Sequence, residues 1–240
     1  MKFIRVYQAG EFNADTAYEL DKSSSNHLIK VLRLKNNFNF NLFNGEGDEF
    51  IATLEIIGKR AIAHIKSPVE TKTESNLSIN LLQGISKGDR MDFVIQKSIE
   101  LGVTSITPVI TEHTVVNLKD DKAQKKLQHW NAIAIAACEQ SGRAYMPKIN
   151  SICHFSDAIN TTTDSTNILL NPLSNTKIQH LNTQTNIQIL IGPEGGLSEN
   201  EIMQAAEKNF IDVNFGPRIL RTETAALAAI TAAQILWGDI

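Results

Sequence analysis

Residues 191–196, IGPEGG, follow the apolar run NIQIL and precede LSENEIMQAAEKNF. A loop that can be neither helix nor strand therefore separates a predicted buried strand from a predicted helix. Gly192, Gly195 and Gly196 permit positive φ and close approach, which leaves main-chain N–H and C=O groups free to bind a polar ligand. In open parallel sheets, ligands bind beyond the carboxyl ends of strands, where such loops lead into helices. Ser198 predicts the start of the helix. A tight strand-to-helix turn explains the loop equally well on its own.

A second Gly-Pro pair follows another apolar strand, in FGPRILRTETAALAAITAAQILW, residues 215–237. Arg218, Arg221 and Glu223 then precede a helix of small apolar residues, which suits an interior or subunit-interface helix. Two Gly-Pro loops after apolar strands can converge on one ligand. In isolation, Arg221 and Glu223 are better explained by helix capping with a surface salt bridge.

Two further segments carry cations that suit contacts with phosphate. In HLIKVLRLK, His27, Lys30 and Arg33 are spaced i, i+3, i+6, which predicts a basic strip along one helical face. In ISKGDRMDFVIQKSIELGV, Lys87 and Arg90 alternate with acidic residues around an amphipathic helix, a mixture that is usually only a solvated face. The formal net charge of -3 argues against a bulk electrostatic grip on nucleic acid but permits a local basic face.

The elements that must position these residues change character along the chain. The first 70 or so residues hold short strand-like stretches, a hairpin turn at FNGEGDEF and one helix near SSSNHLIKVLR, which predicts a small β-rich domain. A polar linker is expected over residues 68–76. Beyond it, nearly wholly apolar strands alternate with helices, which predicts an α/β domain with a parallel sheet covered on both faces.

Composition narrows the function classes. The chain is 42% hydrophobic and 20% charged, no apolar run reaches the roughly 18 residues of a membrane span, and the first residues lack a signal-peptide core, so we expect a cytoplasmic protein without a membrane partner. GxxxxGK[ST], GxGxxG, HExxH and GxSxG motifs are absent from the sequence. The six histidines show no ligand spacing, and Cys138 and Cys153 form no CxxC, so no metal is expected and the cysteines are predicted to be small hydrophobic residues.

Six segments occur in the order and approximate spacing of a known family: HLIKVLRLK, KGDRMDFVIQKSIELGV, EHTVV, AACEQSGR, IGPEGGLSENE and GPRILRTETAALAA. The chain resembles, nearly end to end, the bacterial 16S ribosomal RNA (uracil-N3)-methyltransferase family (ribosomal RNA small subunit methyltransferase E type) of the SPOUT superfamily. IGPEGG together with GPRILRTETA is the most specific pair.

The resemblance implies an α/β fold: a small PUA-like β-barrel RNA-binding domain at residues 1–70, then a SPOUT methyltransferase domain with a deep trefoil knot at residues 76–240. Periodicity alone does not indicate the knot. The resemblance also implies a homodimer, S-adenosyl-L-methionine (SAM) as cofactor, and 16S rRNA or the small ribosomal subunit as partner.

The family resemblance implies that three loops hold the cofactor. The residues carried over are Leu170, Asn171, Gly192, Pro193, Glu194, Gly195, Gly196, Ile219, Leu220, Arg221 and Thr222. Asn171 stands where the family frequently has an acidic residue, which weakens any catalytic role for this side chain. After VLRLK the chain has Asn36-Asn37 where the family commonly has a Gly-Asp turn, and asparagine still permits a turn.

The implied reaction is SAM-dependent methylation of N3 of a specific uridine in 16S rRNA. Arg221 would stabilise the developing uracil anion or grip the substrate phosphate, and Glu223 would orient that arginine or assist proton removal. The RNA backbone would be held by Arg5, His27, Lys30, Arg33, Lys87 and Arg90. Two alternatives stay open: a SPOUT methyltransferase acting at another rRNA or tRNA position, such as a ribose 2′-hydroxyl, and a non-catalytic RNA-binding assembly factor.

Overall fold

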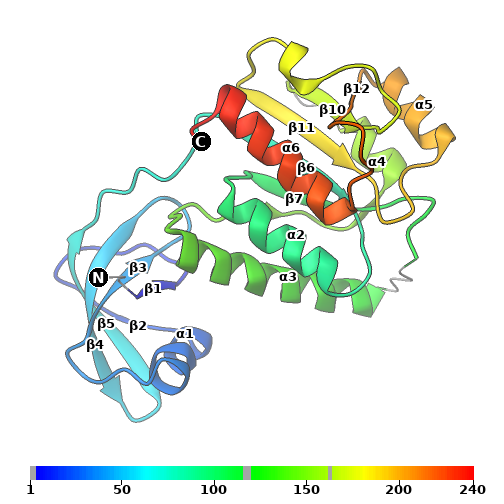
Figure 1. Ribbon diagram of the computed structural model, residues 1–240. Helices are drawn as coiled ribbons and strands as arrows, with labels where there is room; N and C mark the ends of the chain where they lie inside the picture. Colours follow the sequence, from blue (N-terminus) through cyan, green and yellow to red (C-terminus); the bar gives the residue numbers. More distant parts are fainter. Residues whose placement is uncertain (1–3, 116–119, 162–163) are drawn as a thin grey trace. The chain divides into compact units, whose positions relative to one another are not determined.

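The chain forms two compact units in a computed structural model that describes residues 4–115, 120–161 and 164–240 (Figure 1). The first unit comprises the chain up to Glu74 together with a later segment, Cys138–Met146. The second comprises Ser75–Ala137 and Pro147–Ile240. The last turn of one long helix therefore packs with an N-terminal unit from which it is remote in sequence.

A five-stranded sheet forms the first unit, in the order β1-β3-β4-β5-β2, with β1 parallel to β3 and the other neighbours antiparallel. The predicted hairpin joins β3 to β4, and Gly45 and Gly47 adopt φ values of 82° and 109° in its turn. The core of the unit includes the fully buried Leu28 and Phe40. The elements are β1 (Arg5–Tyr7), β2 (Ala17–Glu19), α1 (Lys22–Asn26), the π-helix η1 (His27–Val31), β3 (Asn39–Phe43), β4 (Glu49–Ile57) and β5 (Arg60–Pro68).

The helix that carries the predicted basic strip is shorter and less regular than its spacing indicated. Asp21 caps α1 by accepting a hydrogen bond from the Ser24 N–H, and the chain continues directly into the π-helix η1, which ends at Val31. Arg33 lies beyond that end, with a left-handed φ of 53°. The predicted single helical face for His27, Lys30 and Arg33 is therefore wrong, because π-helical winding and a left-handed residue separate their directions.

A parallel seven-stranded sheet forms the second unit, in the order β12-β10-β11-β6-β7-β8, with β9 also paired to β7. The parallel α/β architecture predicted from the apolar strands is confirmed. The elements are β6 (Ser78–Gly84), α2 (Asp89–Glu100), β7 (Ser105–Ile110), α3 (Asp120–Ser141), β8 (Lys148–Ile149), β9 (Cys153–His154), α4 (Phe155–Asn160), β10 (Thr166–Leu170), the 3-10 helix η2 (Ile178–His180), β11 (Asn186–Ile191), α5 (Glu199–Glu207), β12 (Ile211–Val213) and α6 (Thr222–Trp237).

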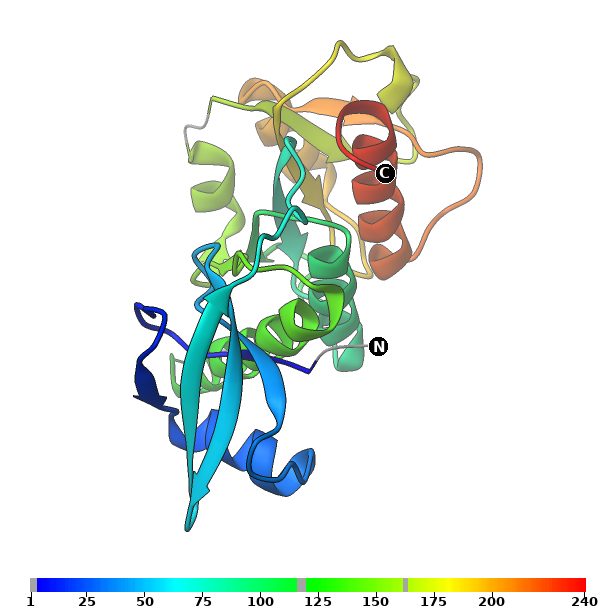
Figure 2. The ribbon, with the colours of Figure 1, turned by 90° about the vertical axis from the view of Figure 1, so that its left-hand side faces the viewer.

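Helices cover both faces of this sheet (Figures 1 and 2). On one face, Phe155 of α4 and Ala205 of α5 pack in a core cluster with Leu82, Leu169 and Leu190 of three adjacent strands. Helices α2 and α6 pack together, and α6 also contacts β11 and η2. Burial on both faces explains why these strands are nearly wholly apolar.

The trefoil knot is expected in the region from β10 to α6. The chain runs from β10 through η2 into β11, then through α5 to β12, and ends in α6, which packs against both η2 and β11. Close backbone packing accompanies this path: a Cβ on Gly84 would lie 2.5 Å from the backbone nitrogen of Pro193. Within the described ranges, no helix is both long enough and apolar enough to cross a membrane.

Candidate functional site

A pocket of about 710 Å³ lies in the second unit, where β10, β11 and β12 end. Because these strands are parallel, the loops that follow them meet at one edge of the sheet. The volume falls in the range of small-molecule sites, about 300–1,000 Å³. All eleven residues carried over for cofactor contact line this one pocket, namely Leu170, Asn171, Gly192, Pro193, Glu194, Gly195, Gly196, Ile219, Leu220, Arg221 and Thr222.

The loop after β11 is both a tight turn and a wall of the pocket. The Gly196 N–H donates a hydrogen bond of 2.9 Å to the Pro193 carbonyl oxygen, and a Cβ on Gly192 would lie 2.8 Å from the Gly196 carbonyl carbon. Ser198 caps α5 in a capping box with Glu201, as the sequence predicted. The two interpretations of this loop are therefore compatible, since the turn itself presents main chain to the pocket.

The Glu194 side chain anchors this loop to the start of α2. Its Oε1 accepts hydrogen bonds from the Lys87 backbone N–H at 3.0 Å and from Arg90 Nη1 at 2.8 Å. Burial acts to raise the pKa of Glu194, but hydrogen bonds from its own N–H, from Lys87 and from Arg90 outweigh burial and lower the pKa. The carboxylate is thus ionised at neutral pH and is engaged by Lys87 and Arg90.

The loop after β12 delivers two charged residues to the pocket without pairing them. Arg221 is the N-cap residue of α6, yet its side chain makes no capping hydrogen bond, and it is exposed. Among the described residues no ion pair joins Arg221 to Glu223. The interpretation as capping with a surface salt bridge is therefore wrong. Glu223 Oε2 is buried and lacks a hydrogen-bond partner within the described ranges, although the residue lines the pocket.

The loop after β10 is shaped by the Asn171 side chain. Asn171 Oδ1 accepts a hydrogen bond of 3.0 Å from the Leu173 N–H, while the Asn171 backbone N–H donates to the Val213 carbonyl at 3.0 Å. The Asn171 side-chain amide thus stabilises the conformation of the loop after β10. Leu173, in the loop after β10, also lines the pocket and was missed in the sequence. Phe215 and Arg218 line it as well; both lie in the predicted second Gly-Pro loop but were not among the residues expected to contact the cofactor.

The residues predicted to bind RNA divide between the two units. In the first, Lys30 and Arg33 are exposed and His27 is half-buried. In the second, Lys87 is exposed, and Arg90 both lines the pocket and pairs with Glu194.

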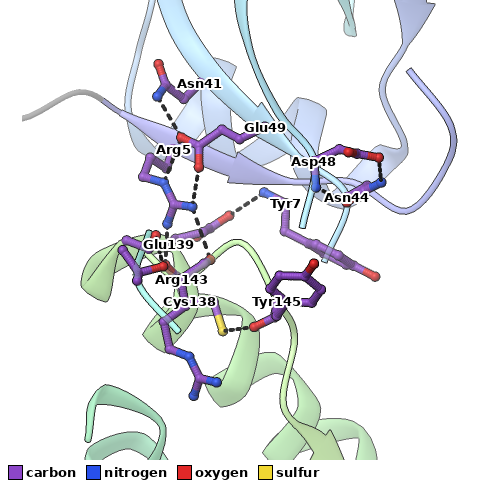
Figure 3. Close-up of polar contacts among 12 residues, drawn as sticks. Arg5, Tyr7, Asn41, Asn44, Asp48, Glu49, Cys138, Glu139, Arg143 and Tyr145 are labelled. Atoms are coloured by element: carbon purple, nitrogen blue, oxygen red, sulfur yellow. Dashed lines mark hydrogen bonds and ion pairs between the residues drawn. The ribbon is translucent and has the colours of Figure 1, made fainter. Parts of the chain in front are cut away.

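Arg5 does not have the free guanidinium that an RNA contact requires (Figure 3). It forms an ion pair of 2.7 Å with Glu49, with side-chain exposures of 9% and 2%. Arg5 Nη1 donates to the Cys138 carbonyl oxygen, and Nη2, which also pairs with Glu49, donates to the Arg143 carbonyl oxygen at 3.1 Å. The guanidinium also stacks on the Phe43 ring, with 4.4 Å to the centroid. The prediction that Arg5 binds RNA is therefore wrong, because this cation is buried and holds the segment 138–146 within the first unit.

The buried thiol of Cys138 is not poised to react. Burial raises the pKa of the Cys138 thiol to about 11, so Cys138 is a neutral thiol, and it donates to the Tyr145 carbonyl. Across the described part of the chain, no cluster of three or more His, Cys, Asp or Glu residues is placed to hold a metal ion.

Comparisons with known proteins give this fold and pocket a class. Residues 73–234 match the family model of an RNA methyltransferase domain, and residues 20–65 match the RNA methyltransferase PUA domain. The fold is that of an RNA methyltransferase of the SPOUT class, preceded by a PUA domain.

Whole-chain relatives narrow the class. The ribosomal RNA small subunit methyltransferase E of Buchnera aphidicola is 38% identical over 98% of this chain and 97% of that relative. The same enzyme from Neisseria gonorrhoeae, solved bound to S-adenosyl methionine, is 41% identical with a TM-score of 0.93, covering 99% of both chains. A Legionella pneumophila methyltransferase solved with bound SAM is 37% identical with a TM-score of 0.97, covering 100% of both chains. The chain belongs to the ribosomal RNA small subunit methyltransferase E family.

Proposed function

We propose that this protein transfers a methyl group from SAM to N3 of a specific uridine in the 16S rRNA of the small ribosomal subunit. The observation that carries the proposal is the convergence of the loops after β10, β11 and β12 on one pocket. Two relatives solved with bound SAM support the cofactor, and the names of the relatives support small-subunit rRNA as the substrate.

The chemistry of the pocket wall fits SAM. Residues 192–196 present main chain to the pocket with little side chain in the way, which suits the polar parts of methionine and adenine. The Gly192 and Pro193 carbonyl oxygens each accept one hydrogen bond within the protein and retain a second lone pair for a ligand. Leu170, Ile219 and Leu220 add apolar surface for the adenosine. When bound, SAM supplies an activated methyl group on a positively charged sulfur.

Arg221 suits the charge that develops on the substrate. Uridine N3 carries an imide proton and is a poor nucleophile until that proton is lost. A cation beside O2 or O4 stabilises the resulting uracil anion, as oxyanion sites do. Arg221 is exposed in the pocket wall and has no ion-pair partner within the described ranges, so its guanidinium is available for the base or the substrate phosphate.

Glu223 supplies a carboxylate whose buried Oε2 has no hydrogen-bond partner among the described residues. A buried acceptor without a partner is costly, and such groups in natural proteins call for a functional explanation. In the pocket wall, Glu223 Oε2 is suited to orient Arg221 or to accept the imide proton. Because N3 lies on the Watson–Crick edge, the target base must be unpaired or flipped out of its stack to reach these groups.

RNA would be held by cations in both units. We propose that residues 1–70 are the PUA-like RNA-binding domain, with contacts from His27, Lys30 and Arg33. Residues 76–240 are the methyltransferase domain, where Lys87 and Arg90 contact the RNA backbone. The small residues of α6 suit the close backbone approach of a homodimer interface. A ribosomal substrate places the enzyme in the cytoplasm.

The test is methylation of a defined substrate. Purified protein is incubated with labelled SAM and either naked 16S rRNA or intact small subunits from a strain that lacks the enzyme, and the labelled nucleoside is identified. We expect 3-methyluridine.

Reverse transcription provides an independent readout of the same reaction. N3-methylation blocks base pairing and stops the polymerase, whereas ribose methylation permits read-through at ordinary nucleotide concentrations. A full-length product from labelled RNA would exclude N3 as the acceptor.

Calorimetry with SAM separates an enzyme from a non-catalytic assembly factor, because the latter needs no cofactor. Absence of binding at millimolar SAM would refute the proposal.

A further inference from the structure

We propose that Gln83 is a positioning residue that holds the loop after β11 and the start of α6 at a fixed separation, so that the pocket is preformed for SAM. The inference rests on the proposed function of that pocket. Gln83 is not among the residues that line the pocket.

Gln83 lies near the carboxyl end of β6, opposite Ile191 of β11, and is completely buried. Its Nε2 donates a hydrogen bond of 2.9 Å to Thr222 Oγ1, at the first turn of α6. Thr222 Oγ1 in turn donates a hydrogen bond of 2.7 Å to the carbonyl oxygen of Gly192. Three segments that are remote in sequence therefore meet through two side chains.

The chemistry of the groups determines the direction of each bond. An amide N–H can only donate, so Thr222 Oγ1 accepts from Gln83 and has one proton left, which it directs to Gly192. Gly192 opens the loop that lines the pocket, and Arg221 directly precedes Thr222. The donor on Gln83 thus fixes the orientation of the Thr222 hydroxyl and, through it, the spacing of both loops.

Gln83 is poorly suited to a purely structural role. Its Oε1 is buried and has no hydrogen-bond partner within the described ranges, and an orphaned acceptor lowers stability. Methionine has a similar length and no polar atom to satisfy. A stabilising core residue would therefore be apolar, whereas a glutamine supplies the directed donor that the Thr222 hydroxyl requires.

The experiment measures SAM affinity by calorimetry and the melting temperature of matched variants. We expect Gln83→Met to weaken SAM binding about tenfold, the effect of losing the directed hydrogen bond to Thr222. The same Nε2 also donates to the adjacent Gly84 carbonyl oxygen at 3.1 Å, and removal of the orphaned Oε1 offsets the loss of that bond, so the melting temperature should be unchanged. Gln188→Met is the control, because Gln188 is also buried in the same sheet, its Nε2 has no partner among the described residues, and it does not line the pocket. Its SAM affinity should equal that of the wild type.

A second variant gives a readout that lost packing would not move. An ionised glutamate at position 83 accepts only, so in Gln83→Glu the Thr222 hydroxyl turns toward it and Gly192 loses its donor. A protonated glutamic acid donates again. The SAM affinity of Gln83→Glu should therefore improve as the pH is lowered, relative to wild type and Gln83→Met titrated over the same range.

The outcomes are distinguishable. Wild-type protein that does not bind SAM overturns the proposed function and with it this inference. If the wild type binds and Gln83→Met binds equally well, the inference alone is wrong. Where Gln83→Met unfolds, the Gln83→Glu titration decides. Recovery of SAM affinity at low pH with an unchanged melting temperature supports positioning, whereas recovery that follows a rise in the melting temperature, or an affinity that stays low at every pH, overturns it.

Discussion

Replacing Arg5 by methionine tests whether this cation is structural, as its burial indicates, or an RNA contact, as the sequence suggested. The substitution keeps the aliphatic length but leaves Glu49 as a buried carboxylate whose remaining partner is Asn41 Nδ2, at 2.6 Å. It also removes the donors to two carbonyl oxygens of the segment 138–146. Removing one partner of a buried pair typically costs about 3–5 kcal/mol, and we expect a loss of that size for the first unit.

The assay must report on the first unit alone. Both tryptophans, Trp130 and Trp237, belong to the second unit, so tryptophan fluorescence would miss the effect. Native-state hydrogen exchange of the β4 amides, residues 49–57, measures the free energy of opening where the ion pair is anchored. We expect protection of these amides to fall by about 3–5 kcal/mol, the penalty for an unpaired buried charge, while the β11 amides keep theirs.

A second variant isolates the charge. Adding Glu49→Gln to Arg5→Met neutralises the orphaned carboxylate but keeps an acceptor for Asn41, so the double variant should regain a large part of the loss. A change below about 1 kcal/mol in the single variant, as for a surface pair, would refute the structural role. An RNA contact would instead show as a fall of about one in the salt slope of RNA binding, with the exchange pattern unchanged.

Three further predictions concern the pocket. Arg221→Ala should keep most of the SAM affinity and lose turnover, since the guanidinium acts on the substrate; retained turnover in the labelled-SAM assay would remove Arg221 from the reaction. Ser198→Ala removes the cap of α5 and should lower the free energy of unfolding of the second unit by about 1 kcal/mol, measured by denaturant titration with tryptophan fluorescence, and no change would contradict the capping box. Burial raises and hydrogen bonds lower the pKa of Glu194, with a net decrease from 4.5, so its anchoring contribution is present at neutral pH and is lost as the pH falls through the folded value. Arg90→Ala should raise that pKa in a carboxyl NMR titration, and an unchanged value would show that the ion pair has no influence.

The parts of the site that sequence reasoning predicted are those with a local signal. Gly192, Gly195 and Gly196 after an apolar strand, and the Ser198 cap, each indicate a conformation within a few residues, and the structure has the predicted loop and helix. The convergence of two such loops followed from the parallel order of strands, itself readable from their apolar composition.

The parts that were missed depend on distant partners. Arg5 lies on a short strand in the described structure, and nothing near it in sequence indicates Glu49 or the carbonyl groups of residues 138 and 143. Arg33 has the spacing expected of a helical residue, but it is itself left-handed. Asparagine or glycine, not arginine, is the usual sequence signal for a left-handed residue, so the end of the helix was not predicted. No residue near Gln83 in the sequence indicates its contact, because the partner, Thr222, lies 139 positions later.

The order of the strands in the parallel sheet has a consequence for folding during synthesis of the chain. The pocket needs β6, β11 and the first turn of α6 together, and the contact between Gln83 and Thr222 spans more than half of the 240 residues. Such non-local contacts form only after the intervening chain has been made and closed. During synthesis the first unit lacks residues 138–146 until most of α3 has emerged, and the pocket lacks its last wall until α6 follows. A nascent chain released before residue 222 would carry most of the sheet and no complete pocket.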